Sequence, residues 1–478
     1  MTYQKKYIVL FFFLFIQQAI FSQKTATIKL SEAISLAQEN NLEVLQNKNQ
    51  LLQQKLQLAQ SQNESLPTVN ATISEFFNFG RSIDPFTNTF LEKNINYNNI
   101  DLNASVVLYN GGALKKVVSQ NQLLLKASEQ DLEAIKQNIA LQVVSAYLSI
   151  LKAQDQLSVT KQQTNITDIQ LDKTNKLIKA GAMPESEILN LQAQKATEQT
   201  DIVTAENNLQ LAKLTFAQLL NRTENTDFEI ERMEIILPQK IDNQLNTAKI
   251  TADATAHQPE ILAAEYRTQS AEKEIEIAKT NFLPTLTASA NWGANQSNAQ
   301  KNYKITGLEQ NKIGYVDINN NQYIVNSQEP IIAENGTVGY FEQLKNTNNY
   351  GFGVQANIPI FSKFSNKNRL AQSKLQKENT ILQAQQIKLQ LRQNIEQACT
   401  NLMIAQKTYE GILTQQNTLE QAFTATQNRY NAGALDFGSY QFQKQNLEKS
   451  KLNLIQSKYE YIFRSKIVDF YQNKPLDF

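Results

Sequence analysis

The feature that most constrains the fold is a long stretch without glycine or proline. From Ala113 to Ala180 neither residue occurs in 68 consecutive positions. A continuous helix of that length reaches about 100 Å, at about 1.5 Å per residue. Apolar side chains recur within it at steps of three and four, as in Leu132, Ile135, Ile139, Val143, Tyr147 and Leu151. This period predicts an amphipathic helix with one packing face and polar side chains elsewhere.

A turn and a returning helix are expected after this stretch. Gly181 interrupts the pattern, and Pro184 follows with Glu185 and Glu187. Proline suits the first helical turn because its missing N–H is not needed there, and acidic residues favour the positive end of the helix dipole. The second helix extends to about Leu220, so the sequence predicts a helical hairpin over residues 113–221.

The pattern occurs twice in the chain. Leu66-Pro67-Thr68 recurs 217 residues later as Leu283-Pro284-Thr285, and Ala180-Gly181-Ala182 recurs 252 residues later as Ala432-Gly433-Ala434. Further matches keep the same two offsets: Asn41-Leu42-Glu43-Val44 with Gln258-Pro259-Glu260-Ile261, and Leu108-Tyr109 with Ile360-Phe361. Constant spacing indicates a tandem duplication, with 35 extra residues in the second copy between Thr285 and Ile360.

The duplication divides the chain into two repeats, residues 23–251 and 252–478. Each begins with a predicted helix, over Ser31–Ser65 and over Pro259–Asn281, and the Leu-Pro-Thr motif ends it because proline disfavours the α conformation before it. The second hairpin is predicted over residues 363–471, with its turn at Gly433 and Asp436 as the cap of the returning helix.

Two stretches of alternating apolar and polar residues separate the first helix from the hairpin in each repeat. They predict strands over residues 68–77 and 100–109, and over residues 285–292 and 350–361. A half-buried soluble sheet has the same alternation. The intervening segments Asn78–Asn99 and Gly293–Asn349 are long, polar and rich in asparagine, as the external loops of outer-membrane barrels are. Four strands cannot close a barrel, so a membrane location requires several chains to share one.

Residues 1–22 are predicted to be a secretory signal peptide. Lys5 and Lys6 precede the apolar run Tyr7–Ile16, and Ala19–Ser22 offers a cleavage site before Gln23. The run is too short for a membrane-spanning helix, which needs about 20 apolar residues. The mature protein is therefore expected to be exported.

Composition argues against most enzyme classes. Forty-six basic and 45 acidic residues leave a net charge of +1, which gives no whole-chain case for binding nucleic acid. The single Cys399 and single His257 exclude a Cys/His zinc site and a disulfide framework. We expect no catalytic residues, no metal and no cofactor. His257 precedes a helix and is assigned a capping role, while Cys399 is assigned to packing.

The duplication, the strand pairs, the Leu-Pro-Thr motifs and the two hairpins with Ala-Gly-Ala turns together resemble the outer-membrane efflux protein family, the TolC-like channels. The resemblance implies an α+β membrane protein that forms a homotrimer. Each chain would contribute four transmembrane strands to a twelve-stranded barrel, and the tandem-duplicated hairpins would form a periplasmic α-barrel. Asp227–Thr251 and the C-terminal tail would form a belt around it. The family has no catalytic activity, and its members are exit ducts in the outer membrane that extend into the periplasm.

The resemblance also assigns roles to residues. Gly181, Ala182, Gly433 and Ala434 match the hairpin tips that a periplasmic adaptor contacts, although a helix-ending glycine is expected there in any case. Tyr430 matches a tyrosine that helps to close the periplasmic end, with packing between helices as the alternative. Some members carry acidic residues six and nine positions after this glycine, where this chain has Ser439 and Phe442. Tyr440, Phe442 and Asp436 are therefore the other gate candidates.

Phe76, Phe77 and Trp292 lie near strand ends and are candidates for an aromatic girdle in contact with outer-membrane lipid, with loop packing as the alternative.

The function predicted from the sequence is a passive outer-membrane exit duct. It would dock with a periplasmic adaptor and an inner-membrane pump and export small molecules such as drugs or metal ions. The same channel in type I protein secretion is the nearest alternative. A periplasmic coiled coil or adhesin without a pore is an alternative of another class.

Overall fold

The computed structural model describes residues 27–83, 88, 90–92, 94–222, 228–232, 237 and 246–476. The predicted signal peptide lies outside these residues, as does most of the segment assigned to the belt. The described residues form two compact units. One comprises parts of Met1–Leu56, Gln122–Ser270 and Lys377–Phe478, and the other parts of Gln57–Asn121 and Ala271–Gln376.

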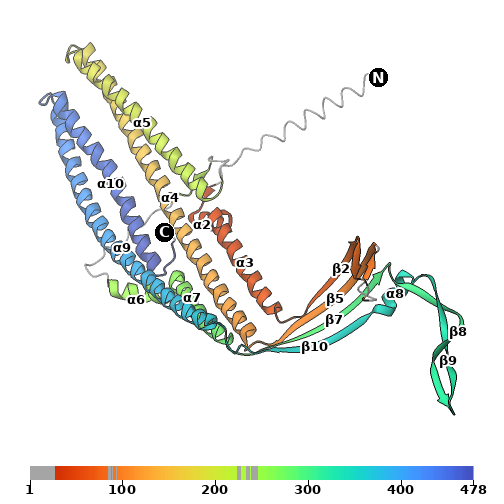
Figure 1. Cartoon of the computed structure of the whole chain (residues 1–478). Coiled ribbons are helices and arrows are strands. Elements are labelled where there is room, and N and C mark those ends of the chain that lie inside the picture. Colours follow the sequence, from red (N-terminus) through yellow and green to blue (C-terminus); the bar gives the residue numbers. More distant parts are fainter. Residues whose placement is uncertain are drawn as a thin grey trace, which may run out of the picture. The chain divides into compact units, whose positions relative to one another are not determined.

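Two helical hairpins dominate the first unit (Figure 1). Helix α4 (Ala113–Lys179) is followed by α5 (Ser186–Leu219), and α9 (Ser365–Asn431) is followed by α10 (Phe437–Tyr471). Helices α4 and α9 are both 67 residues long. The length of α4 is the one expected from the stretch without glycine or proline. Gly411 lies inside α9 without interrupting it. Lys363 and Phe364, predicted to begin the second hairpin, instead have positive φ and precede α9.

The helix predicted at the start of the first repeat consists of two helices. Helix α2 (Leu30–Asn40) and α3 (Leu42–Asn63) are separated at Asn41, which has extended backbone geometry. In the second repeat, α6 (Thr247–His257) and α7 (Pro259–Thr280) have the same lengths as α2 and α3. Proline accounts for the break before α7, whereas Asn41 ends α2 without one. The prediction of one continuous helix over Ser31–Ser65 is therefore wrong, because the helix is interrupted at Asn41.

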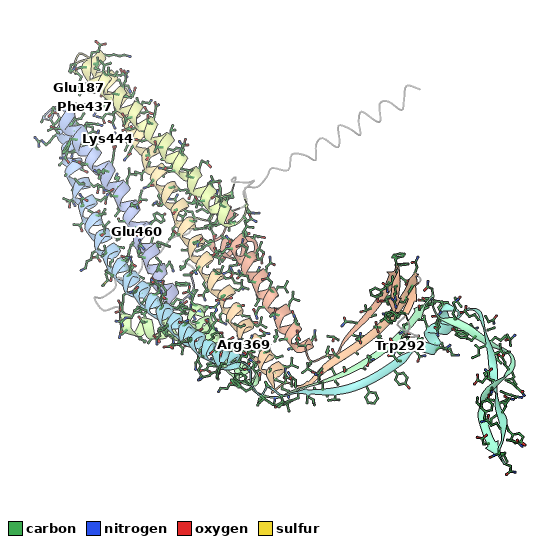
Figure 2. The ribbon with its side chains drawn as sticks, in the orientation of Figure 1. Glu187, Trp292, Arg369, Phe437, Lys444 and Glu460 are labelled. Carbon is green, nitrogen blue, oxygen red and sulfur yellow. The ribbon has the colours of Figure 1, made fainter. Side chains whose placement is uncertain are left out.

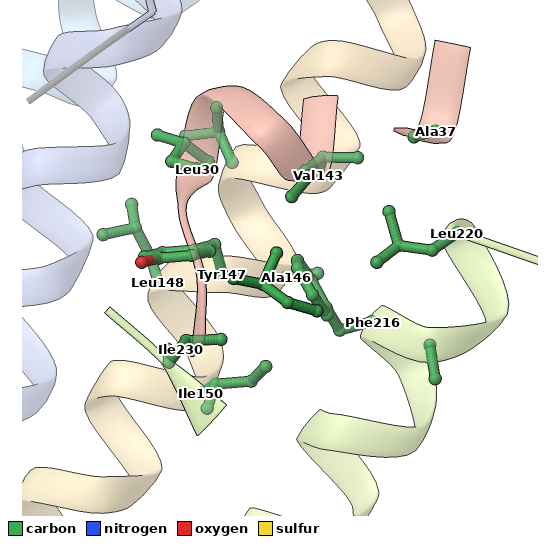
Figure 3. Close-up of a cluster of buried hydrophobic side chains, with 14 of the residues drawn as sticks. Leu30, Ala37, Val143, Ala146, Tyr147, Leu148, Ile150, Phe216, Leu220 and Ile230 are labelled. Carbon is green, nitrogen blue, oxygen red and sulfur yellow. The ribbon is translucent and has the colours of Figure 1, made fainter. Parts of the chain in front are cut away.

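A hydrophobic core lies where the first hairpin meets the N-terminal segments (Figure 3). Tyr147 of α4 and Phe216 of α5 are fully buried and make an edge-to-face ring contact with centroids 6.0 Å apart. Strand β1 (Thr27–Ile28) pairs in parallel with β6 (Glu229–Ile230), and the Tyr147 hydroxyl donates to the carbonyl of Glu231 at 2.6 Å. A second core joins α6, α7, α9 and α10, and it includes Cys399.

The second unit contains a four-stranded antiparallel sheet with the strand order β10-β7-β5-β2 (Figure 1). Its strands are β2 (Thr68–Asn78), β5 (Ile95–Tyr109), β7 (Thr285–Ser297) and β10 (Asn349–Asn357). All four predicted strands exist. However, β5 and β7 extend five residues further than predicted at one end, and β10 ends at Asn357 rather than at residue 361.

Cross-strand pairing places most of the predicted apolar positions of the four strands on one face of the sheet. Leu108 falls at a bulge in β5, and Ile358 and Ile360 lie beyond the end of β10. That face carries Val69, Ala71, Ile73, Ile100, Leu102, Ala104, Val106, Leu286, Ala288, Ala290, Trp292, Tyr350, Phe352, Val354 and Ala356. The other face carries mainly asparagine, threonine, serine, glutamine, glycine and Asp101, with Val107, Phe76 and Tyr97 among the exceptions. The apolar face is exposed within the chain, as Phe352 at 92% shows. Among the described strands, β2 and β10 each pair on one side only.

The segment predicted to be a long polar loop between β7 and β10 is largely ordered secondary structure. Strand β8 (Lys301–Ile318) pairs with β9 (Asn321–Thr337), and α8 (Tyr340–Thr347) follows. Strand β7 continues past its last pair with β10, which is Gly293 with Asn349. Beyond that pair, two side chains of α8 accept hydrogen bonds from backbone N–H groups of β7. The Thr347 hydroxyl accepts from the Asn295 N–H at 3.0 Å, and Gln343 Oε1 accepts from the Ser297 N–H at 2.8 Å. The equivalent segment of the first repeat contains the short pair β3 (Arg81–Ile83) and β4 (Phe90–Glu92).

Candidate functional site: the hairpin ends and the packing between the hairpins

The two hairpin turns have the same backbone geometry. Gly181 has φ of +72° and Gly433 has φ of +71°. At the first turn the N–H of Gly181 donates to Ile178 O and that of Ala182 to Leu177 O, both at 2.9 Å. The second turn repeats these bonds from Gly433 to Tyr430 O and from Ala434 to Arg429 O. This is the Schellman motif, in which a left-handed residue allows two carbonyls at the helix end to be satisfied. The glycines and the following alanines are exposed.

The helices that leave the two turns begin differently. Asp436 caps α10, as predicted, because its carboxylate accepts from the Ser439 N–H at 2.8 Å and from the Ser439 hydroxyl at 2.7 Å. The hydrogen bond from the Ser439 side chain is the main reason that the pKa of Asp436 lies below its usual value. Helix α5 begins after Glu185, whose side chain makes no capping hydrogen bond. The carboxylate of Asp436 is thus committed to the local cap.

Tyr430 and Tyr440 form the centre of an aromatic cluster between α9 and α10 of the second hairpin. Their rings stack with centroids 4.6 Å apart, Phe437 lies beside Tyr430, and Phe423 lies beside Tyr440. Tyr440 is only 1% exposed, and its hydroxyl donates to Gln170 Oε1 of α4 at 3.1 Å. Burial raises the pKa of Tyr440 to about 12, so the phenol is neutral and can donate. Within the chain, Tyr440 therefore packs between helices.

Phe442 is the aromatic gate candidate that is accessible. Its side chain is 62% exposed, two positions beyond the buried Tyr440 on α10. The sequence identified both tyrosines of the cluster but not Phe423, Phe437 or Gln170. The seven-residue spacing of Phe423 and Tyr430 on α9 was a signal that could have placed them on one face.

A buried group of charges lies next to the aromatic cluster, and sequence reasoning missed it. Lys444 of α10 forms an ion pair with Glu198 of α5, with Lys444 Nζ 3.1 Å from Glu198 Oε1. Thr167 of α4 lies between them, accepting from Lys444 at 2.6 Å and donating to Glu198 Oε1 at 2.8 Å. Glu448 lies one turn further along α10, with its carboxylate 3.4 Å from the ammonium. Lys444, Glu187 and Phe437 mark this end of the hairpins in Figure 2.

The aromatic girdle candidates do not share one face of the sheet. Trp292, which is labelled in Figure 2, pairs with Leu102 and Tyr350, and this register places it on the apolar face. Phe77 has the same side-chain direction as Val69, whereas Phe76 points to the opposite face and stacks on Tyr97 with centroids 4.9 Å apart.

His257 and Cys399 have structural surroundings. His257 is the last residue of α6, and its Nδ1 lies 3.0 Å from Asp253 O. It therefore serves the end of α6 and not, as predicted, the start of the next helix. Cys399 is buried in the second core, as predicted, and burial raises the pKa of its thiol.

The described part of the chain lacks two features that would change its classification. It contains no helix long and apolar enough to cross a membrane. The same residues include no cluster of three or more His, Cys, Asp or Glu side chains able to hold a metal ion.

The arrangement of repeated hairpins and sheet has known relatives. The model of the outer membrane efflux protein family matches residues 33–222 and 251–465. Outer membrane protein TolC of Vibrio cholerae is 26% identical over 295 residues, which cover 60% of this chain and 63% of that protein. TolC of Escherichia coli is 27% identical over 190 residues, or 37% of each chain. The matched region thus spans less than two thirds of either relative. The crystal structure of CusC has a TM-score of 0.71 at 14% identity, covering 96% of this chain and 95% of that one.

These matches define a TolC-like outer-membrane protein of the channel class. The chain belongs to the outer membrane efflux protein family. It is accordingly an outer-membrane protein and not an enzyme, as the sequence predicted. The similarity to CusC concerns the fold alone, and it supports the helical hairpins joined to a β domain.

Proposed function

We propose that the protein is a passive exit duct that works as a homotrimer in the outer membrane. The observation that carries the proposal is the four-stranded sheet, which has a continuous exposed apolar face and two open edges, β2 and β10. Apolar surface costs about 25 cal/mol per Å² in water, and open edges are not tolerated in lipid. Three copies, pairing β10 of one with β2 of the next, would remove the edges in a twelve-stranded barrel whose apolar face meets lipid. Trp292 and Phe77 would then contribute to its aromatic girdle.

The hairpins would form a water-filled periplasmic α-barrel. Their long helices carry many glutamine, asparagine and threonine side chains, which suit a tube wall with water on one side. The exposed turns at Gly181–Ala182 and Gly433–Ala434 would contact the periplasmic adaptor, which links the duct to an inner-membrane pump. Tyr430 and Phe442 would lie near the closed end, with Tyr440 and Asp436 supporting the helices there.

The transported material would be small molecules such as drugs or metal ions. Type I protein secretion would use the same duct, so the two uses differ in the partner proteins and not in the channel. An adaptor and a proton-driven pump encoded beside the gene favour efflux, and a peptide-exporting ABC transporter favours secretion. Loss of the gene should lower resistance to drugs or detergents in the first case and abolish export of a protein in the second.

The duct itself is tested with the purified mature protein. Size measurement in detergent should give a trimer, and a monomer would contradict the shared barrel. Planar bilayers should show conductance that Tyr430→Ala increases. Complete absence of conductance from the wild type and this variant would favour a structure without a pore, the alternative raised by the sequence.

A further inference from the structure

Lys444 is a buried cation that contacts both helices of the opposite hairpin. From α10 its Nζ donates to the Thr167 hydroxyl of α4 and to Glu198 Oε1 of α5. The side chains of Lys444 and Glu198 are only 7% and 4% exposed. The two hairpins are therefore joined here through charges that have been removed from water.

Stability alone does not explain this pair. Removing two charges from water costs several kcal/mol for each ion, and apolar side chains of the same volume are often equally stable. An ion pair with directed hydrogen bonds is favourable in only one relative position of the helices. A shift of α10 by one helical turn, about 5.4 Å, would take Lys444 out of reach of Glu198. The contact thus defines the relative position of the hairpins.

Each charge also has a second partner on its own side of the contact. Glu198 Oε1 accepts from Thr167 and from Gln194 Nε2, at 2.8 and 2.9 Å, and both belong to the α4–α5 hairpin. Lys444 lies 3.4 Å from Glu448 on its own helix. If the hairpins separate, neither charge loses all its partners, so the main penalty of breaking a buried pair is reduced.

We propose that Lys444 is a positioning residue that holds the two hairpins in their closed packing and transfers from Glu198 to Glu448 when they separate. The proposal rests on the proposed channel function and names the contact that must break for the α9–α10 hairpin to move. Glu448 then acts as the partner of the open arrangement, and Glu198 as the partner of the closed one.

The proposal predicts opposite effects of two substitutions at one cluster. In planar bilayers, Lys444→Met should raise the ratio of open to closed channel roughly tenfold or more, the factor expected for losing a hydrogen bond between charged groups. Glu448→Gln should lower that ratio, because the ammonium loses its charged partner in the open arrangement. A purely structural role would change both in the same direction or neither.

A matched control is available on the hairpin surface. Lys161 and Glu206 form an ion pair of 2.8 Å within the α4–α5 hairpin, with side chains 53% and 48% exposed. Lys161→Met should leave gating unchanged, because exposed pairs contribute little and this one does not join the hairpins.

If Lys444→Met fails to fold, the double variant Lys444→Met/Glu198→Met keeps the test decisive. It removes both charges and should fold, while the ratio of open to closed channel should still rise. A double variant with wild-type gating would overturn the proposal, as would an increase in opening with Glu448→Gln.

A failure of the channel proposal can be distinguished from a failure of the role proposed for Lys444. If no variant and no wild-type preparation conducts, amide exchange in α10 near Lys444 is the remaining measurement. The double variant should speed this exchange relative to the wild type and Lys161→Met, and unchanged exchange would overturn the positioning role of Lys444.

Discussion

The glycines of the second hairpin allow one chemical change to be tested with opposite expected signs. Gly433 ends α9 with φ of +71°, whereas Gly411 lies within the same helix. A Cβ atom built on either glycine meets nothing within 4 Å. Packing is therefore equal at the two positions, and only backbone conformation distinguishes them.

The expected free energies follow from that conformation. Alanine in a left-handed conformation costs about 1–2 kcal/mol, so Gly433→Ala should destabilise the turn. In a helix interior alanine is favoured over glycine by about 1 kcal/mol, so Gly411→Ala should stabilise α9.

Local amide exchange is the appropriate measurement, because about 1–2 kcal/mol corresponds to a change of roughly 5- to 30-fold in a local equilibrium. Gly433→Ala should speed exchange at residues 433 and 434, whose N–H groups close the turn. Gly411→Ala should slow exchange around residue 411. If Gly433→Ala left the turn unchanged or slower to exchange, the left-handed geometry assigned to this turn would be wrong.

Three further predictions concern buried groups. Burial raises the pKa of Glu448, and the negative charge of Glu198 raises it further. The positive charges of Lys444 and Lys451 lower it, but the net shift for Glu448 is upward. Its ionisation therefore opposes folding, a contribution that is absent below its unfolded pKa and develops as pH rises through the folded pKa. Glu448→Gln should raise the denaturation midpoint at neutral pH and lose that gain in acid, and an equal gain at both pH values would contradict the shift. Tyr147→Phe should destabilise the fold by about 1 kcal/mol in denaturant titration, because it removes the hydrogen bond to Glu231 O; a neutral effect would argue against that bond. Cys399 is the only cysteine, and burial raises its pKa, so thiol labelling should be slow until denaturant unfolds the chain; rapid labelling of folded protein would refute its burial.

Features with local causes could be predicted from the order of residues alone. Gly181 and Gly433 mark the hairpin turns because a left-handed residue is needed where each helix ends. The absence of glycine and proline predicted the length of α4. Alternation predicted the four strands and their two faces, and side-chain parity alone separates Phe76 from Phe77. The duplication could be detected because both copies retain these local signals.

The side chains that meet between helices became known from the folded structure and could not be predicted beforehand. A long helix with polar residues on most faces does not reveal which of them faces a neighbour, so nothing local distinguishes Lys444 from the exposed Lys161. Its partners Thr167 and Glu198 come from two other helices, far away in sequence. The pairing of β8 with β9 likewise depends on contacts between residues up to 36 positions apart, from Lys301 to Thr337, in a segment whose polar composition is typical of a loop. Burial and partner choice are properties of the packed helices and strands, and one segment of sequence does not contain them.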